Sequence, residues 1–116
     1  MIVDVQVLDD FVYLLEGKDQ DYLLFAIQES GSKDVFIHMV QAFHGEDDLF
    51  EFGEETFSTK VWVADDYWLD QLMYAMVEHI AVNKIDPENP VSLYHSIGGV
   101  LRSPPKPNLV PYNLIN

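Results

Sequence analysis

The chain has 116 residues, no cysteine, and twenty acidic side chains against six basic ones, which gives a net charge of −14. Its apolar content of 48% supports one compact domain and excludes intrinsic disorder, which combines high net charge with low hydrophobicity. The lack of cysteine excludes disulfides and thiolate metal sites. No apolar run reaches the roughly 18 residues of a membrane-spanning helix, and residues 1–7 lack the features of a secretory signal. We therefore expect a cytoplasmic protein with no membrane partner.

Five segments show the alternation or the apolar content of β-strands: residues 3–7, 11–15, 22–28, 35–43 and 57–63. In the first segment valines alternate with polar residues, which predicts a strand with one wet face. A loop at 16–20 joins the second and third segments as a hairpin. The fourth segment is apolar at nearly every position, which favours a central strand covered on both faces.

Residues 65–83 show the clearest helical pattern in the chain. Asp65 or Asp66 suits the N-cap, and Asp70 extends the acidic first turns that the helix dipole favours. Twelve of the sixteen residues from 67 to 82 are apolar, so we expect most of this helix to be buried. Strands that precede one main helix indicate an α+β fold, in which the helix packs on an antiparallel sheet of four to five strands.

The C-terminal end is rich in proline and predicts an extended tail over residues 103–116, after a single domain at 1–102. The tail contains several large apolar side chains, which would form a sticky patch if they were exposed. We therefore expect it to pack on its own domain or on a second copy. A monomer and a homodimer both remain open.

The negative charge is concentrated in the first two-thirds of the chain. Residues 1–35 carry eight acids and two lysines, and residues 44–70 carry nine acids and one lysine, whereas residues 71–116 carry three of each sign. Nucleic acids and anionic membranes both require a basic surface. Direct binding to either of them is therefore not expected.

The segment 45–55 is the sharpest local feature, because it places six carboxylates next to Leu49, Phe50 and Phe52. It is open to three interpretations. One is a solvated loop whose phenylalanines pack inward. Another is a docking element, in which the carboxylates steer a basic partner and a phenylalanine anchors it. A calcium site is less favoured, because the segment lacks the alternating acids and central glycine of an EF-hand loop.

The helix carries a second candidate, a narrow polar stripe in steps of three and four residues: Asp66, Tyr67, Asp70, Tyr74 and Glu78. Tyrosine is enriched at protein interfaces, because it buries area and keeps a polar tip. The alternative is that both tyrosines lie half-buried at the sheet edge with their hydroxyls in water.

The chain offers little evidence for catalysis or for a cofactor. His38 and His44 would lie some 20 Å apart on a regular strand, too far to share a metal, and no HExxH pattern is present. No serine lies in a GxSxG context, and no phosphate-binding glycine motif appears. We therefore expect a binding protein rather than an enzyme, without a cofactor or metal.

The net charge suggests the kind of partner. Duplex DNA carries one charge per about 1.7 Å, so fourteen charges correspond to roughly 24 Å of duplex. A 13.3 kDa protein spans a similar length, some 30 Å. The composition resembles that of DNA-mimic and anti-restriction proteins, although no specific family motif matches. We hypothesise a small acidic protein that occupies the nucleic-acid-binding surface of a nuclease, a restriction or CRISPR effector, or a nucleoid protein.

The residues expected to contact this partner are acidic or aromatic side chains of the two segments above: Glu46, Asp47, Asp48, Phe50, Glu51, Glu54, Glu55, Asp66, Tyr67, Asp70, Tyr74 and Glu78. An alternative is an immunity protein that neutralises one cationic toxin, since the substrate site of a toxic nuclease is also basic. A further alternative is that the acidity serves only solubility or adaptation to high salt.

Overall fold

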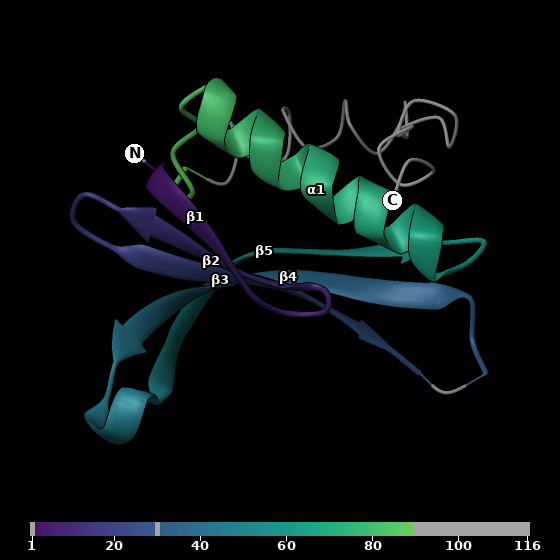
Figure 1. Ribbon diagram of the computed structural model, residues 1–116, viewed down its shortest axis with the longest axis horizontal. Helices are drawn as coiled ribbons and strands as arrows, with labels where there is room; N and C mark the ends of the chain where they lie inside the picture. Colours follow the sequence, from purple (N-terminus) through teal and green to yellow (C-terminus); the bar gives the residue numbers. More distant parts are fainter. Residues whose placement is uncertain (1, 30, 90–116) are drawn as a thin grey trace, which may run out of the picture.

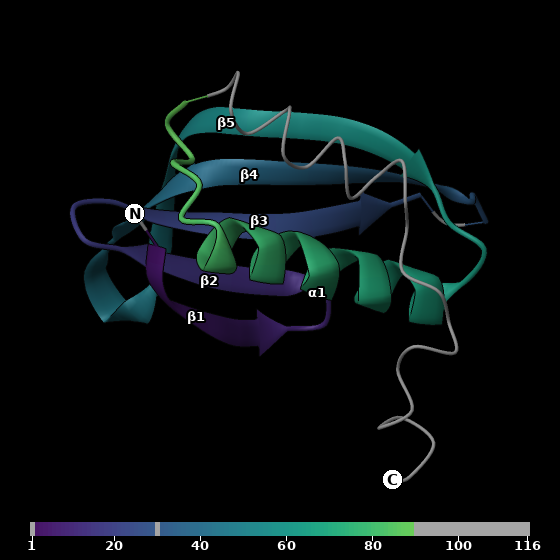
Figure 2. The same ribbon diagram turned by 90° about the horizontal axis from the view of Figure 1, so that it is seen from above.

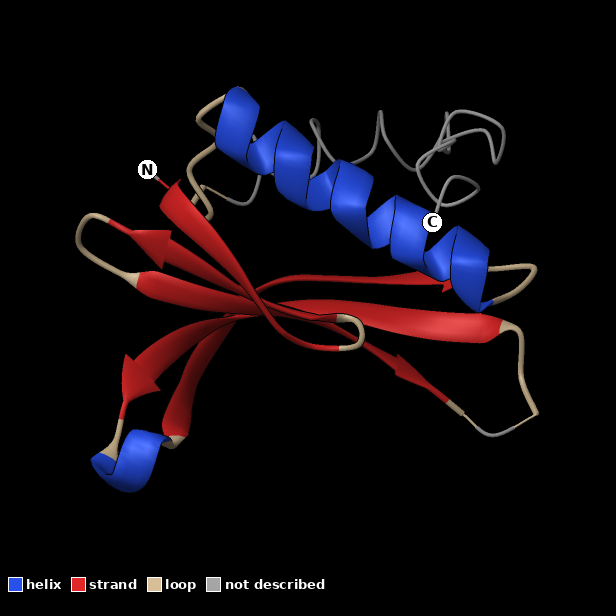
Figure 3. Ribbon diagram, in the orientation of Figure 1, coloured by secondary structure: helices blue, strands red, loops and turns tan. Residues whose placement is uncertain are grey.

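The computed structural model describes residues 2–29 and 31–89. They form a five-stranded antiparallel sheet in the order β1-β2-β3-β4-β5, with a long helix, α1, across one face (Figure 1, Figure 3). The elements in chain order are β1 (Ile2–Asp9), β2 (Val12–Gly17), β3 (Asp21–Gln28), β4 (Asp34–His44), a single 3₁₀ turn (Glu46–Asp48), β5 (Phe50–Trp62) and α1 (Asp66–Val82). Each strand pairs with the one before it, so the sheet is a simple meander. The structure confirms the predicted α+β fold.

The main hydrophobic core lies between the sheet and α1. The helix contributes side chains at the spacing of one helical face: Leu69, Leu72, Met73, Met76, Val77 and Ile80. The sheet contributes alternate positions of its strands, which all point to the helix: Tyr13, Leu15, Tyr22, Leu24, Val35, Ile37, Met39 and Phe57. Seen from above, α1 runs along the β1–β3 half of the sheet (Figure 2).

Specific hydrogen bonds hold the start of α1 and the segment that follows the helix. The carboxylate of Asp65 accepts a bond from the backbone N–H of Trp68 at 2.9 Å, which confirms Asp65 as the N-cap. Beyond the helix, the carboxylate of Glu88 accepts bonds of 2.7 Å from the hydroxyl of Tyr22 and from Nε2 of Gln41. These two bonds tie the segment after the helix to β3 and β4.

A second, smaller cluster lies on the other face of the sheet, which we call the helix-free face. Its buried side chains are Leu14, Leu23, Val40 and Ala42, with Val12, Phe25 and Phe50 packed against them. They are covered because β5 is bent: from Met39↔Phe57 to Ala42↔Phe52 the register advances three residues on β4 and five on β5. Extra residues on one strand bend a hairpin, and Figure 1 shows the β4–β5 hairpin curving away from α1.

Three details differ from the sequence-based predictions. The central strand is not covered on both faces, because Phe36 is 41% exposed on a face that no helix within residues 2–29 and 31–89 covers. The first strand is confirmed, but Val3 and Val7 are exposed, because β1 is an edge strand whose register shifts between Ile2 and Asp4. The acidic segment is not a loop, since most of it belongs to the 3₁₀ turn and to β5, which begins at Phe50.

The predicted tail at 103–116 and the domain boundary at residue 102 lie outside the described residues. Within residues 2–29 and 31–89, no helix has both the length and the apolar character needed to span a membrane.

Candidate functional site

The acidic hairpin, residues 45–55, forms the end of the β4–β5 hairpin. Glu46, Asp47 and Asp48 make the 3₁₀ turn, which the backbone bond from Gly45 N to Leu49 O closes at 2.7 Å. Asp47 adopts a left-handed backbone conformation, with φ of 58°, which Asp tolerates better than most residues. The side chains of Glu46, Asp47, Glu51, Glu54 and Glu55 are exposed, whereas that of Phe50 is partly buried. The hairpin therefore presents carboxylates to solvent, with Phe50 packed behind them.

The polar stripe of α1 lies on the other side of the sheet. Asp66, Asp70, Tyr74 and Glu78 are exposed, and Tyr67 is half-buried. Figure 1 shows the acidic hairpin on the side of the sheet away from α1. The structure therefore does not bring the two predicted groups of contact residues together into one surface. The meander topology separates them, because the helix returns over one face while the hairpin bends toward the other.

The described part of the chain is more acidic than the whole. It holds all twenty carboxylates but only four lysines, a net charge of −16. Within residues 2–29 and 31–89 both ion pairs use histidine: His38 with Glu55 at 2.9 Å, and His44 with Asp21 at 2.8 Å. The excess of carboxylates is thus not offset by lysines among the described residues.

The helix-free face carries a continuous row of aromatic rings, which we call the ring row: Phe36, His38, Phe25 and Phe52. Successive ring centroids lie 6.5, 5.5 and 6.1 Å apart, and successive ring planes differ by 20°, 28° and 23°. The row crosses three strands, since its members belong to β4, β3 and the bent part of β5. The two rings at the ends, Phe36 and Phe52, are 41% and 63% exposed, so the row is open to solvent at both ends.

Hydrogen bonds hold the centre of the ring row in place. Nδ1 of His38 lies 2.9 Å from Oε2 of Glu55 and 3.3 Å from the hydroxyl oxygen of Ser58. The imidazole also stacks between Phe25 and Phe36. A ring fixed on its edge and on both sides loses little further freedom when a partner binds, which is the property of a preorganised binding surface.

Carboxylates share the helix-free face with the ring row. Strand alternation and register place five of them on the helix-free face: Asp4, Glu16, Asp21, Asp34 and Glu55. The described residues of this face include one lysine, Lys60, which lies opposite Phe36 on the neighbouring strand. An apolar centre with a charged rim is the usual anatomy of a protein–protein interface.

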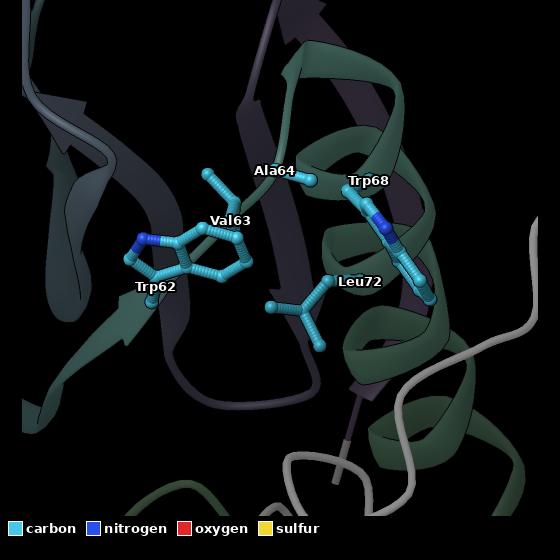
Figure 4. Close-up of a pocket in the computed structure, with 5 residues that line it drawn as sticks. All are labelled: Trp62, Val63, Ala64, Trp68 and Leu72. Carbon is cyan, nitrogen blue, oxygen red and sulfur yellow. The ribbon is translucent and has the colours of Figure 1, made fainter.

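A small apolar cavity lies where β5 meets the start of α1. It has a volume of about 180 Å³ and is lined by Trp62, Val63, Ala64, Trp68 and Leu72. Figure 4 shows the two indole rings on either side, with Leu72 between them. Trp62 is 69% exposed, and the lining offers no carboxylate, histidine or hydroxyl. The cavity can accept one apolar side chain, but it holds no group for acid–base or nucleophilic chemistry.

The buried hydroxyl group of Tyr22 has a structural role. Burial, together with the hydrogen bond to Glu88, raises the pKa of the Tyr22 hydroxyl well above its ordinary value. The side chain of Tyr22 lies in the main core, and its hydroxyl holds the segment after α1 to the sheet. Among residues 2–29 and 31–89, no group of three histidine or acidic side chains is arranged to hold a metal ion.

Sequence reasoning missed most of the ring row. The sequence places Phe52 in the acidic segment and Phe25, Phe36 and His38 in predicted strands, but it does not predict that the four rings share a surface. The alternation of Phe36 and His38 along one strand was the available signal.

Comparison of the chain with protein-family models, with curated proteins and with solved structures finds no match. The site must therefore be interpreted from its own geometry.

Proposed function

We propose that this protein binds a basic nucleic-acid-binding protein and blocks the surface with which that partner holds nucleic acid. The observation that carries the proposal is the charge of residues 2–29 and 31–89, which hold twenty carboxylates and four lysines. A cationic groove built for phosphates attracts such a surface over long range. The acidic hairpin supports the proposal further, because its exposed carboxylates lie on a projecting element (Figure 1).

The test is a capture experiment with competition. The full-length chain is immobilised, exposed to nuclease-treated host lysate at low salt, and washed with either duplex DNA or polyglutamate at equal charge and ionic strength. We expect a basic protein to be retained and to be released by the duplex but not by polyglutamate. If nothing basic is retained, or if the duplex releases nothing, the proposal is wrong.

Two matched variants locate the contact. Glu46→Gln, Asp47→Asn and Glu51→Gln remove three charges from the acidic hairpin. Asp66→Asn, Asp70→Asn and Glu78→Gln remove three charges from the helix stripe. We expect the hairpin variant to lose capture and the helix variant to keep most of it, because the two groups lie on opposite sides of the sheet. Equal capture by both variants would contradict a role for the hairpin.

A second candidate is an immunity protein that neutralises one cationic toxin, and the ring row favours it. Rigid aromatic anchors produce tight and exclusive binding, whereas carboxylates alone attract many basic proteins. An immunity protein would retain a single toxin from the lysate, and excess duplex would displace it slowly or not at all. A DNA mimic would retain several basic proteins that all dissociate in duplex DNA.

A further inference from the structure

The ring row offers a surface that charge attraction alone does not explain. The four buried side chains of the helix-free face already form an apolar floor, and the rings stand beside this floor with both ends exposed. Isolated exposed phenylalanines are common, but stacked rings that meet at 5.5 to 6.5 Å form a contiguous apolar patch. Contiguous patches with a polar rim mark interaction sites.

The rim restricts what can cover this patch. Five carboxylates and one lysine of the described residues share the face, so a nucleic acid or an anionic membrane would be repelled. A second copy of the chain would bring like charges together, which disfavours a symmetric dimer here. Charge complementarity therefore points to a cationic occupant that also gains from contact with aromatic faces.

Arginine meets both requirements better than lysine does. Its guanidinium group is planar, stacks on aromatic rings, and pairs with a carboxylate through two parallel hydrogen bonds. Glu55 lies beside the centre of the row, where it bonds His38, and Asp34 lies on the same strand face as Phe36 and His38. A guanidinium over Phe36 would thus have a ring face and the carboxylate of Asp34 two positions away along β4, and one over His38 would have the carboxylate of Glu55 beside it.

We propose that the helix-free face binds an arginine-rich segment of the protein partner, with guanidinium groups stacked on the ring row and paired with the carboxylates of the same face. This inference rests on the proposed function, because it names the part of a basic partner that the protein holds. It assigns recognition to β3, β4 and β5, and it leaves the polar stripe of α1 outside the contact.

The test compares two peptides of equal charge, nona-arginine and nona-lysine, in NMR titrations of the full-length ¹⁵N-labelled protein at moderate salt. We expect nona-arginine to bind roughly tenfold more tightly, because stacking adds to the charge attraction that both peptides share. Its shift changes should centre on the ring row, whereas the amides of α1 should change little.

Two variants are chosen to remove an aromatic ring without unfolding the protein, so that a loss of binding can be assigned to the ring. Phe36→Leu and Phe52→Leu retain apolar volume at exposed positions and remove only the ring, so the fold should persist. We expect each to lose most of the preference for arginine while the affinity for nona-lysine stays unchanged. Val7→Leu is the control, because Val7 is an exposed residue of β1 outside the ring row, and it should change neither affinity.

The outcomes separate the inference from the proposed function. Equal affinity for both peptides, unaffected by the phenylalanine variants, would overturn the arginine site and leave a general attraction for basic partners intact. Binding of neither peptide would overturn both. A stable dimer in sedimentation, dissociated by Phe52→Leu, would also overturn the inference, because a second copy would then cover the face.

Discussion

The two faces of the sheet are built from the same five strands, yet they are covered in different ways. On one face, α1 seals a core in which Leu69, Met73 and Met76 have no solvent exposure. On the other face, the bent β4–β5 hairpin covers only a small cluster and leaves Phe36 and Phe52 exposed. The helix-covered face therefore holds the main core, whereas the helix-free face keeps aromatic rings exposed, and it is on this second face that we propose recognition.

The largest change in the free energy of unfolding is expected for a substitution in the core of the helix-covered face. Leu69→Ala removes a fully buried side chain from the centre of the main core. We expect the free energy of unfolding to fall by about 2–5 kcal/mol, because the transfer free energy is lost and a cavity remains. Urea denaturation followed by far-UV circular dichroism measures this change. A loss below about 1 kcal/mol would show that α1 is not the main source of stability.

A smaller loss of stability is expected for a substitution at Gly53, where the β4–β5 hairpin bends toward the helix-free face. A Cβ atom at Gly53 would lie 2.6 Å from Cε2 of Phe43, 2.7 Å from Oε1 of Gln41 and 3.0 Å from its Cβ. Gln41 also bonds Glu88 and accepts from the backbone N–H of Glu54. We therefore expect Gly53→Ala to destabilise the protein by about 1–3 kcal/mol, the range for overpacking.

Hydrogen exchange distinguishes a local effect of Gly53→Ala from a global one. Amides of β5 near Gly53 should exchange faster in the variant, whereas those of α1 should keep their relative protection. Gly31→Ala is a useful comparison, because nothing lies within 4 Å of that position and its cost would come from its positive φ of 80° alone. Unchanged stability of Gly53→Ala would show that the side chains of Phe43 and Gln41 move aside freely.

Removal of the hydrogen bond between Tyr22 and Glu88 tests whether this bond holds the segment after α1 to the sheet. Tyr22→Phe should lower the free energy of unfolding by about 1 kcal/mol at neutral pH, the net value of one such bond. Burial and Glu88 raise the pKa of Tyr22, so above about pH 10 the unfolded chain loses this proton while the folded chain keeps it. Fewer protons are then bound in the unfolded state, and stability falls as pH rises.

The pH dependence gives this prediction its control. Below pH 10 the stability difference between the wild type and Tyr22→Phe should be constant, and above it the difference should shrink. Equilibrium unfolding in urea from pH 8 to pH 11 measures both curves. A difference that grows with pH would contradict a buried, protonated hydroxyl at this position.

The helix and most strands could be predicted because their signals are local. Capping at Asp65 and the apolar spacing over 67–82 set the bounds of α1 to within one residue. The start of β5 could not be predicted in this way, because acidic residues at 51–55 have low strand propensity. Pairing with β4 keeps them extended, and pairing is a tertiary property.

The candidate site depended even more on tertiary structure. The ring row combines residues from three strands, and Phe52 joins it only because β5 carries extra residues that bend the hairpin. The acidic hairpin and the helix stripe are both exposed, as their composition indicated, but only the topology shows that they face opposite ways. A one-dimensional pattern reports which residues are polar, and the fold decides which of them can share a partner.

The smallest expected effect on stability is the most informative about function. Phe52→Leu should change the free energy of unfolding by less than about 0.5 kcal/mol, because the side chain is largely exposed in the free protein. If the ring instead supported the fold, its removal would cost as much as a core substitution, and the contrast between the two faces would fail. A stable Phe52→Leu variant that has lost its preference for arginine would show that this ring serves binding and not the core.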